Sequence, residues 1–397
     1  MSVLRAATVA LAFGGSVLLT RTLGAEGRGT LAALIAAASI VMPFTQGGLE
    51  WLNRRFVASH PHMLFGLIRF SLGAPLLLSL VAAPAVIGWF LVYPLAHQTS
   101  VQLAIAAVAV YLMAVAPVLN GLLLGLHRTT AFMLAAAAGK LANLVGVIGL
   151  YAIGVLNPTT ALATFAVAYA LQAALTFAWL PPIPSSERLS ACNFVWSRRH
   201  FLLQMTLHDA LSLAATFCLP LLLAAHASLA EAGYFAAALT MTDAIAKTFG
   251  MLHLYGVSRL AAASAHDERA ALASSLGRIS LWGMAAIASA ACLAAPSVIP
   301  LLLGQSFAPA VPVFRVLCLG MLATAIGDAA KTELVSGSER WTNTAPAAIQ
   351  FLAVIVTAPW LVGHFGAIGA AWSLVAGIAL SAGAGHVILI RAAPHRS

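Results

Sequence analysis

Charged side chains are scarce in this sequence, because Asp, Glu, Lys and Arg together make up only 8% of its 397 residues. A soluble globular domain carries about 25% charged residues. Hydrophobic residues account for 61% of the chain, and many apolar runs reach the roughly 18 residues that indicate a membrane-spanning helix. The sequence therefore predicts an all-α integral membrane protein and argues against a soluble fold or a barrel of short alternating strands.

Cysteine is also rare. The four cysteines, Cys192, Cys218, Cys292 and Cys318, are widely spaced, and no two of them are separated by two residues. We expect free packing residues, with no disulfide and no metal site.

The short motifs of common enzyme classes are missing as well. The sequence has no Walker A phosphate-binding loop, no HExxH zinc motif and no GxSxG nucleophile turn. A membrane-embedded polymerase would need a large outer loop rich in His and Arg, and the longest polar stretches, residues 181–200 and 258–278, are too short to form a domain. We therefore expect no enzyme activity and no cofactor, and a polymerase is only a minor alternative.

The formal net charge of +9 comes from basic residues scattered among short segments between the apolar runs. Nucleic-acid binding would require them to cluster on a soluble domain, so we expect no nucleic-acid partner.

The apolar runs define twelve predicted membrane spans. They cover residues 6–22, 30–49, 70–93, 101–126, 131–151, 159–180, 201–225, 232–256, 279–303, 311–330, 345–363 and 366–390. All but three of the 20 Lys and Arg residues then fall on one side, and Arg21, Arg28 and Arg315 fall on the other. The excess of positive charge inside places both termini in the cytoplasm of a multi-pass membrane protein. We expect the first apolar run to stay as an uncleaved helix.

The Pro-rich residues 181–184 divide these spans six and six. The sequence AEGRGTLAALIAA at 25–37 is similar to AEAGYFAAALTMT at 230–242, and GLHRT at 125–129 is similar to GSERW at 337–341. These matches predict an internal duplication with a six-helix lobe at 1–180, a cytoplasmic linker at 181–200 and a second lobe at 201–397. Repeats of six helices are parallel, so the lobes would be related by a pseudo-two-fold axis along the membrane normal, with a cleft between them.

Four segments resemble one transporter superfamily. RTLGAEGRGTLA at 21–32, AEAGYFAAA at 230–238, LLLGQSFAPAVPVFRVLCLG at 301–320 and FGAIGAAWSLVAG at 365–377 are similar to the multidrug/oligosaccharidyl-lipid/polysaccharide (MOP) exporters, and within them to the Wzx-like polysaccharide flippases. The resemblance implies alternating access that moves an undecaprenyl-pyrophosphate-linked oligosaccharide to the outer leaflet, for O-antigen, capsule or exopolysaccharide synthesis. It also implies membrane lipids, polysaccharide synthesis proteins and an H⁺ or Na⁺ coupling ion as partners.

A pyrophosphate headgroup needs cationic ligands, since it cannot cross hydrocarbon unaided. The predicted substrate-binding residues are Arg21, Arg28, Arg54, Arg55, Lys140, Lys247 and Arg315. Each also has a simpler explanation. Arg54 and Arg55 would serve as topology determinants, Lys140 and Arg315 as interface anchors, and Glu26 would neutralise Arg21 or Arg28.

The predicted span 232–256 carries an acid and a base, Asp243 and Lys247, four residues apart on one helix face. Facing lipid would cost each about 3 kcal/mol, so we expect that face to meet protein or water. Asp243 is a candidate for ion coupling or for a static pair with Lys247, and Lys247 has snorkelling as its alternative. His208 and Asp209, in the seventh span, are candidates for a proton relay or for an interfacial hydrogen-bonded pair.

The main alternative is a MATE-type multidrug or cation antiporter of the same fold. Such antiporters commonly use an acid in the first helix for coupling, and residues 6–22 contain none.

Overall fold

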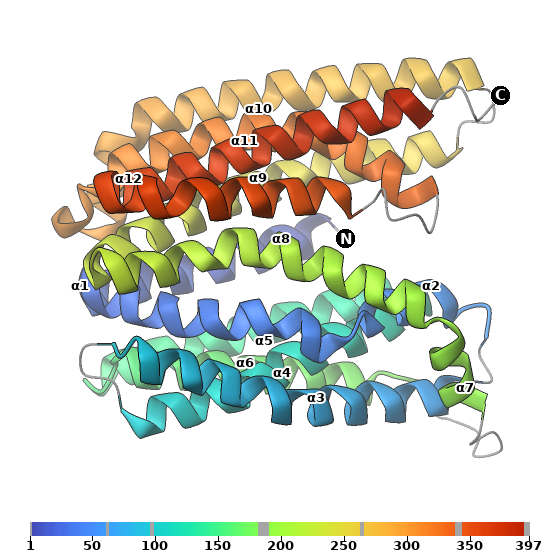
Figure 1. Ribbon diagram of the computed structural model, residues 1–397, viewed down its shortest axis with the longest axis horizontal. Coiled ribbons are helices and arrows are strands. Elements are labelled where there is room, and N and C mark those ends of the chain that lie inside the picture. The colour runs from blue at the N-terminus through green and yellow to red at the C-terminus, as the bar shows by residue number, and fades with distance from the viewer. Residues whose placement is uncertain are drawn as a thin grey trace. The chain divides into compact units, whose positions relative to one another are not determined.

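The computed structural model describes residues 2–60, 63–95, 99–181, 190–262, 266–337 and 344–392, and within them the chain is helical with no strand (Figure 1). The all-α class predicted from composition is confirmed. The helices are α1 (Ser2–Gln46), α2 (Leu49–Phe56), α3 (Leu64–Val92), α4 (Ser100–Gly125), α5 (Thr129–Ala152), α6 (Pro158–Ala178), α7 (Ser190–Ser197), α8 (Arg199–His226), α9 (Leu229–Ala262), α10 (His266–Leu303), the short 3₁₀ helix η2 (Gln305–Phe307), α11 (Ala310–Gly337) and α12 (Ala345–Ala392).

Each predicted span corresponds to a helix or to half of one. Among the described residues, nine helices are long and apolar enough to cross a membrane, and the spans within α1 and α12 are 41 and 44 residues long. That is about twice the 20 residues that one crossing needs. Together with α9, which holds the predicted span 232–256, these helices account for the twelve predicted spans.

Glycine breaks α1 and α12 in two. The backbone leaves helical geometry at Gly24, with φ 66° and ψ −176°, and at Gly366, with φ 53° and ψ −132°. Both residues lie in or next to the turns predicted between two spans. Glycine adopts a positive φ without the steric penalty of a Cβ atom, so the chain reverses there and starts a new helix.

Side-chain caps fix where α4 and α6 begin. The Thr99 hydroxyl accepts a hydrogen bond from the Gln102 backbone N–H, and the Gln102 side chain accepts one from the Thr99 N–H. Asn157 and Thr160 make the same reciprocal pair at α6. Each pair satisfies N–H groups that a helix start would otherwise leave without partners.

Two short helices, α2 and α7, were not predicted. The chain enters α2 through Gly47 and Gly48, which have φ of 56° and 69°. Asn53 is buried on α2, and its side-chain amide donates to the Ser71 hydroxyl at 2.9 Å and to the Val118 carbonyl at 3.0 Å. These bonds and the buried Leu49 and Leu52 hold α2 against α3 and α4.

The contacts divide the chain into two compact units. Unit 1 contains Met1–Leu23 and Thr30–Leu221, and unit 2 contains Gly24–Gly29 and Leu222–Ser397. Most of α8 therefore belongs to unit 1, where Phe201 joins the core formed with α2, α3 and α4. The division into six-helix lobes at 1–180 and 201–397, with its linker at 181–200, stays a prediction.

Candidate functional site

Four arginines gather at one end of unit 1, where α2 meets the junction of α7 and α8. We call Arg54, Arg55, Arg198 and Arg199 the arginine cluster. The Arg55 guanidinium carbon lies 5.5 Å from the ring centres of both Phe56 and Phe201. Contacts of this kind orient a guanidinium and contribute roughly 0.5–1 kcal/mol each where they are exposed to water.

The other members of the cluster also lie over aromatic rings. The Arg198 guanidinium is 4.9 Å from the Phe56 ring centre, and Arg199 is 5.9 Å from that of Trp196. Phe56 in turn packs edge-on against Phe194 and Phe201 at 5.8 Å. The cluster is therefore built on an aromatic base that joins α2, α7 and α8.

The sequence of α2 explains why its two arginines face outward. Leu49, Leu52 and Asn53 are buried and lie three and four residues apart on one face. Arg54 and Arg55 follow in the last turn and are exposed. Such an arrangement exposes the guanidinium groups to solvent, and arginine matches phosphate oxygens with two parallel hydrogen bonds.

An acidic pair lies next to this cluster. The Trp51 indole N–H donates to an Asp209 carboxylate oxygen at 2.9 Å, which ties α2 to α8. Glu50, the neighbour of Trp51, is half-buried, and this burial raises the pKa of its carboxyl to about 7. The Asp209 charge raises that pKa further, and the Arg54 charge lowers it.

The role of Glu50 was missed by sequence reasoning, although a signal existed. It is the only acidic residue between Glu26 and Glu187. It lies just after the second predicted span, and nothing in the local sequence indicates burial. Only the packing of α2 shows that its side chain is half-buried.

Unit 2 holds Arg28. Its side chain is buried, and one guanidinium nitrogen donates to the Thr240 hydroxyl on α9 at 3.0 Å. Gly29 and Gly233 let the two helices approach, because a Cβ on Gly29 would lie 1.8 Å from the Leu229 carbonyl oxygen. Arg21, by contrast, is exposed in unit 1.

Asp243 and Lys247 form the ion pair that their spacing predicts. Both side chains are more than half exposed on α9, at 52% and 61%. Neither is buried in the core of unit 2, so the pair faces outward from that unit. Its use in transport stays a prediction.

The remaining predicted residues lie on other helix pairs. The Lys140 ammonium is 5.5 Å from the ring centre of Tyr169, which links α5 and α6. The Arg315 Nε donates to the Cys292 carbonyl at 3.2 Å, which links α11 and α10. His208 is half-buried beside Asp209 on α8. The structure thus brings Arg54 and Arg55 together and places Asp209 near them, but distributes the other candidates over both units.

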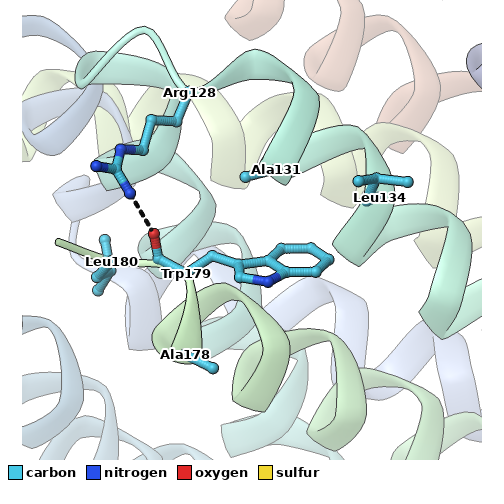
Figure 2. Close-up of a pocket in the computed structure, with 6 residues that line it drawn as sticks. All are labelled: Arg128, Ala131, Leu134, Ala178, Trp179 and Leu180. Atoms are coloured by element: carbon cyan, nitrogen blue, oxygen red, sulfur yellow. Dashed lines mark hydrogen bonds between the residues drawn. The ribbon is translucent and has the colours of Figure 1, made fainter.

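A pocket of about 400 Å³ opens between the ends of α5 and α6 (Figure 2). Arg128 lies at its edge and donates to the Trp179 carbonyl at 2.9 Å. Ala131, Leu134 and Leu180 make the rest of the lining largely apolar. None of the predicted site residues lines this pocket.

The chain is similar to known proteins in its structure. No protein-family model matches the chain, and no curated protein matches it. Among solved structures, a multidrug resistance MATE family transporter of the MOP superfamily, in its inward-facing conformation, matches at 16% identity with a TM-score of 0.70, covering 99% of this chain and 98% of that one. The fold is that of the MOP superfamily.

Two further MOP-type matches span nearly the whole chain. The lipid II flippase MurJ, in an inward closed conformation, aligns with a TM-score of 0.76 and 12% identity over 96% of this chain and 86% of that one. A MOP superfamily transporter from Pyrococcus furiosus aligns at 0.63 and 17% identity, over 99% and 95%. The resemblance to MOP exporters read from the sequence is therefore confirmed for the fold. At these identities the likeness does not separate a drug transporter from a lipid flippase.

Proposed function

We propose that this protein is a flippase of the bacterial inner membrane that moves an undecaprenyl-pyrophosphate-linked oligosaccharide from the cytoplasmic to the outer leaflet for surface polysaccharide synthesis. Both termini would lie in the cytoplasm. Lipid-linked sugar would enter and leave by alternating access, handed over by polysaccharide synthesis proteins on either side. The likeness to a lipid II flippase over 96% of the chain supports this proposal.

The observation that carries the proposal is the arginine cluster on its aromatic base. The positive-inside rule places Arg54, Arg55, Arg198 and Arg199 at the cytoplasmic end of unit 1. Guanidinium groups bind phosphate oxygens, and the exposed ring of Trp196 beside Arg199 can pack against the C–H face of a sugar. One surface therefore offers ligands for both parts of the headgroup where the substrate is made.

The other predicted residues would act later in the cycle. Arg28, Arg21 and Arg315 lie on the predicted outer side and would receive the pyrophosphate there. Lys140 and Lys247 would bind the pyrophosphate as it passes between the cytoplasmic and outer sides. Asp209, His208 and Asp243 would bind the H⁺ or Na⁺ that drives the return.

A MATE-type antiporter for cationic drugs remains the second candidate, favoured by the likeness to a MATE transporter at 0.70. Its substrates are repelled by an exposed arginine cluster. The first predicted span, 6–22, also lacks the acid that such antiporters commonly use. Both features favour the flippase.

Reconstituted protein provides a test. In proteoliposomes loaded with a fluorescent undecaprenyl-pyrophosphate-linked oligosaccharide, wild-type protein should expose inner-leaflet substrate to an external quencher. Arg55→Ala should slow this exchange at least roughly tenfold, since a charged hydrogen bond contributes about 1.5–3 kcal/mol.

Arg69→Ala is the matched control. Arg69 is exposed and lies over the Phe65 ring at 5.8 Å, as Arg55 lies over Phe56, but it belongs to α3 outside the cluster. It should exchange substrate at the wild-type rate. Equal rates for wild type and Arg55→Ala, or no exchange by the wild type with export of a cationic dye instead, would contradict the proposal.

A further inference from the structure

Arg54 belongs both to the arginine cluster and to the surroundings of Glu50. It lies one helical turn after Glu50 on α2, and its guanidinium carbon is 5.7 Å from the ring centre of Trp51. Its positive charge lowers the pKa of the Glu50 carboxyl, so it favours the ionised acid. A change in charge at Arg54 must therefore alter the proton affinity of Glu50.

Few other charged groups lie on the helices that pack against Glu50. On α4, Gly121 faces Glu50 so closely that a Cβ there would lie 2.5 Å from the Glu50 carbonyl oxygen. The only titratable side chain of α4 is Tyr111. On α8, Asp209 and its neighbour His208 are the titratable groups beside it. Of the two arginines on α2, Arg54 is the one whose charge acts on Glu50.

Two half-buried acids whose charges interact cannot both ionise at low cost. Trp51 fixes Asp209 on one side of α2, where its charge opposes ionisation of Glu50. The positive charge of Arg54 partly compensates for this effect, because it favours the ionised form of Glu50. An anion bound by Arg54 would neutralise that charge, so that only the Asp209 charge would then act on Glu50.

We propose that the arginine cluster and Glu50 form a proton-linked anion site, in which binding of a pyrophosphate diester at Arg54 and Arg55 increases the fraction of Glu50 that is protonated, with the proton taken from the cytoplasmic water. The choice of a pyrophosphate diester rests on the proposed function. The linkage is reciprocal, so a protonated Glu50 strengthens anion binding by the same factor. A headgroup would then be captured together with a proton and released when that proton leaves.

The size of the effect is limited by solvent. Arg54 is exposed, so its interaction with Glu50 is partly screened, and a change of one pKa unit corresponds to a tenfold change in affinity. We expect the affinity for the diester to rise by up to about tenfold as the pH falls from 8 to 6, a window centred on the Glu50 pKa of about 7.

The experiment uses the purified full-length protein in detergent and a short-chain dialkyl pyrophosphate diester. Both phosphates of a diester are fully ionised near neutral pH, so any proton that is taken up belongs to the protein. Calorimetric titration in two buffers of different ionisation enthalpy gives the number of protons bound per ligand. Wild-type protein should take up a proton fraction that is largest near pH 7.

Glu50→Gln should bind the diester with an affinity that no longer depends on pH, and without proton uptake. Arg69→Ala, which leaves the cluster intact, should behave like the wild type. If Glu50→Gln does not fold, Asp209→Asn serves instead. Removing the Asp209 charge should move the pH window of proton uptake to lower pH.

Proton uptake that survives unchanged in Glu50→Gln would come from another group and would overturn the proposal. So would diester binding by the wild type without proton uptake, or a window that Asp209→Asn leaves in place. None of these outcomes depends on whether the protein flips a lipid-linked sugar. A protein that flips lipid-linked sugar but binds no proton with the diester contradicts this inference alone.

Discussion

At the scale of single residues, the carboxyl of Glu50 shows what burial costs. Its pKa rises from 4.5 in the unfolded chain to about 7 in the folded one. Below pH 4.5 the group is protonated in both states, and between 4.5 and 7 only the folded chain holds the proton. The contribution of this group to the free energy of unfolding is therefore largest below pH 4.5. It falls by up to roughly 3 kcal/mol as the pH rises to 7.

This pH dependence can be measured by thermal unfolding of the detergent-purified protein. The Tm of the wild type should fall between pH 4.5 and 8 relative to that of Glu50→Gln, whose amide cannot ionise. Two Tm curves that run parallel across this range would show that Glu50 is solvated and would remove the basis of its shifted pKa.

Arg54 and Arg55 illustrate how far residue types alone can guide a prediction. Their charge and their place after a span predicted a role in topology first and phosphate binding second. The aromatic base under them could not be predicted, because Phe56, Phe194 and Phe201 come together only through packing of α2, α7 and α8. The same holds for Glu50 and Asp209, which are far apart in the sequence.

At the scale of helices, the contact between α9 and the second half of α1 depends on glycine. A Cβ on Gly233 would lie 2.0 Å from the Ala25 carbonyl oxygen, closer than two such atoms can approach. The helices must separate to admit even one methyl group. The same contact positions the buried Arg28 against Thr240.

Gly233→Ala should therefore destabilise unit 2, and we expect a cost of about 1–3 kcal/mol from the forced shift of well-packed helices. Gly14→Ala is the control, because nothing lies within 4 Å of a Cβ at Gly14. The measurement is the Tm of both variants in detergent. A Tm for Gly233→Ala at or above that of Gly14→Ala would show that the helices do not meet there.

The helices themselves were largely predictable, and the exceptions have a physical cause. Long apolar runs mark spans because the bilayer allows little else. The helices α2 and α7 have eight residues each; α2 mixes apolar with charged side chains, and α7 mixes apolar with uncharged polar ones. They are set by packing on α3, α4 and α8, which no local pattern records. The kinks at Gly24 and Gly366 coincide with predicted turns because glycine tolerates a positive φ.

At the scale of the whole molecule, composition was enough to predict an all-α membrane protein, because only 8% of the residues are charged. The MOP-type fold was predicted from the four segments that resemble those exporters. The substrate cannot be predicted in the same way, because MOP-type folds include both MATE transporters and a lipid II flippase. It depends on side chains such as those of the arginine cluster, whose arrangement varies within one fold.

The flippase account is tested most directly by the location of the lipid-linked oligosaccharide in cells without this protein. The account predicts that surface polysaccharide is lost and that the undecaprenyl-pyrophosphate-linked oligosaccharide accumulates in the cytoplasmic leaflet, where a membrane-impermeant enzyme added outside cannot reach it. Restoring the wild-type gene should return it to the outer leaflet. Normal surface polysaccharide with no trapped intermediate would contradict the account.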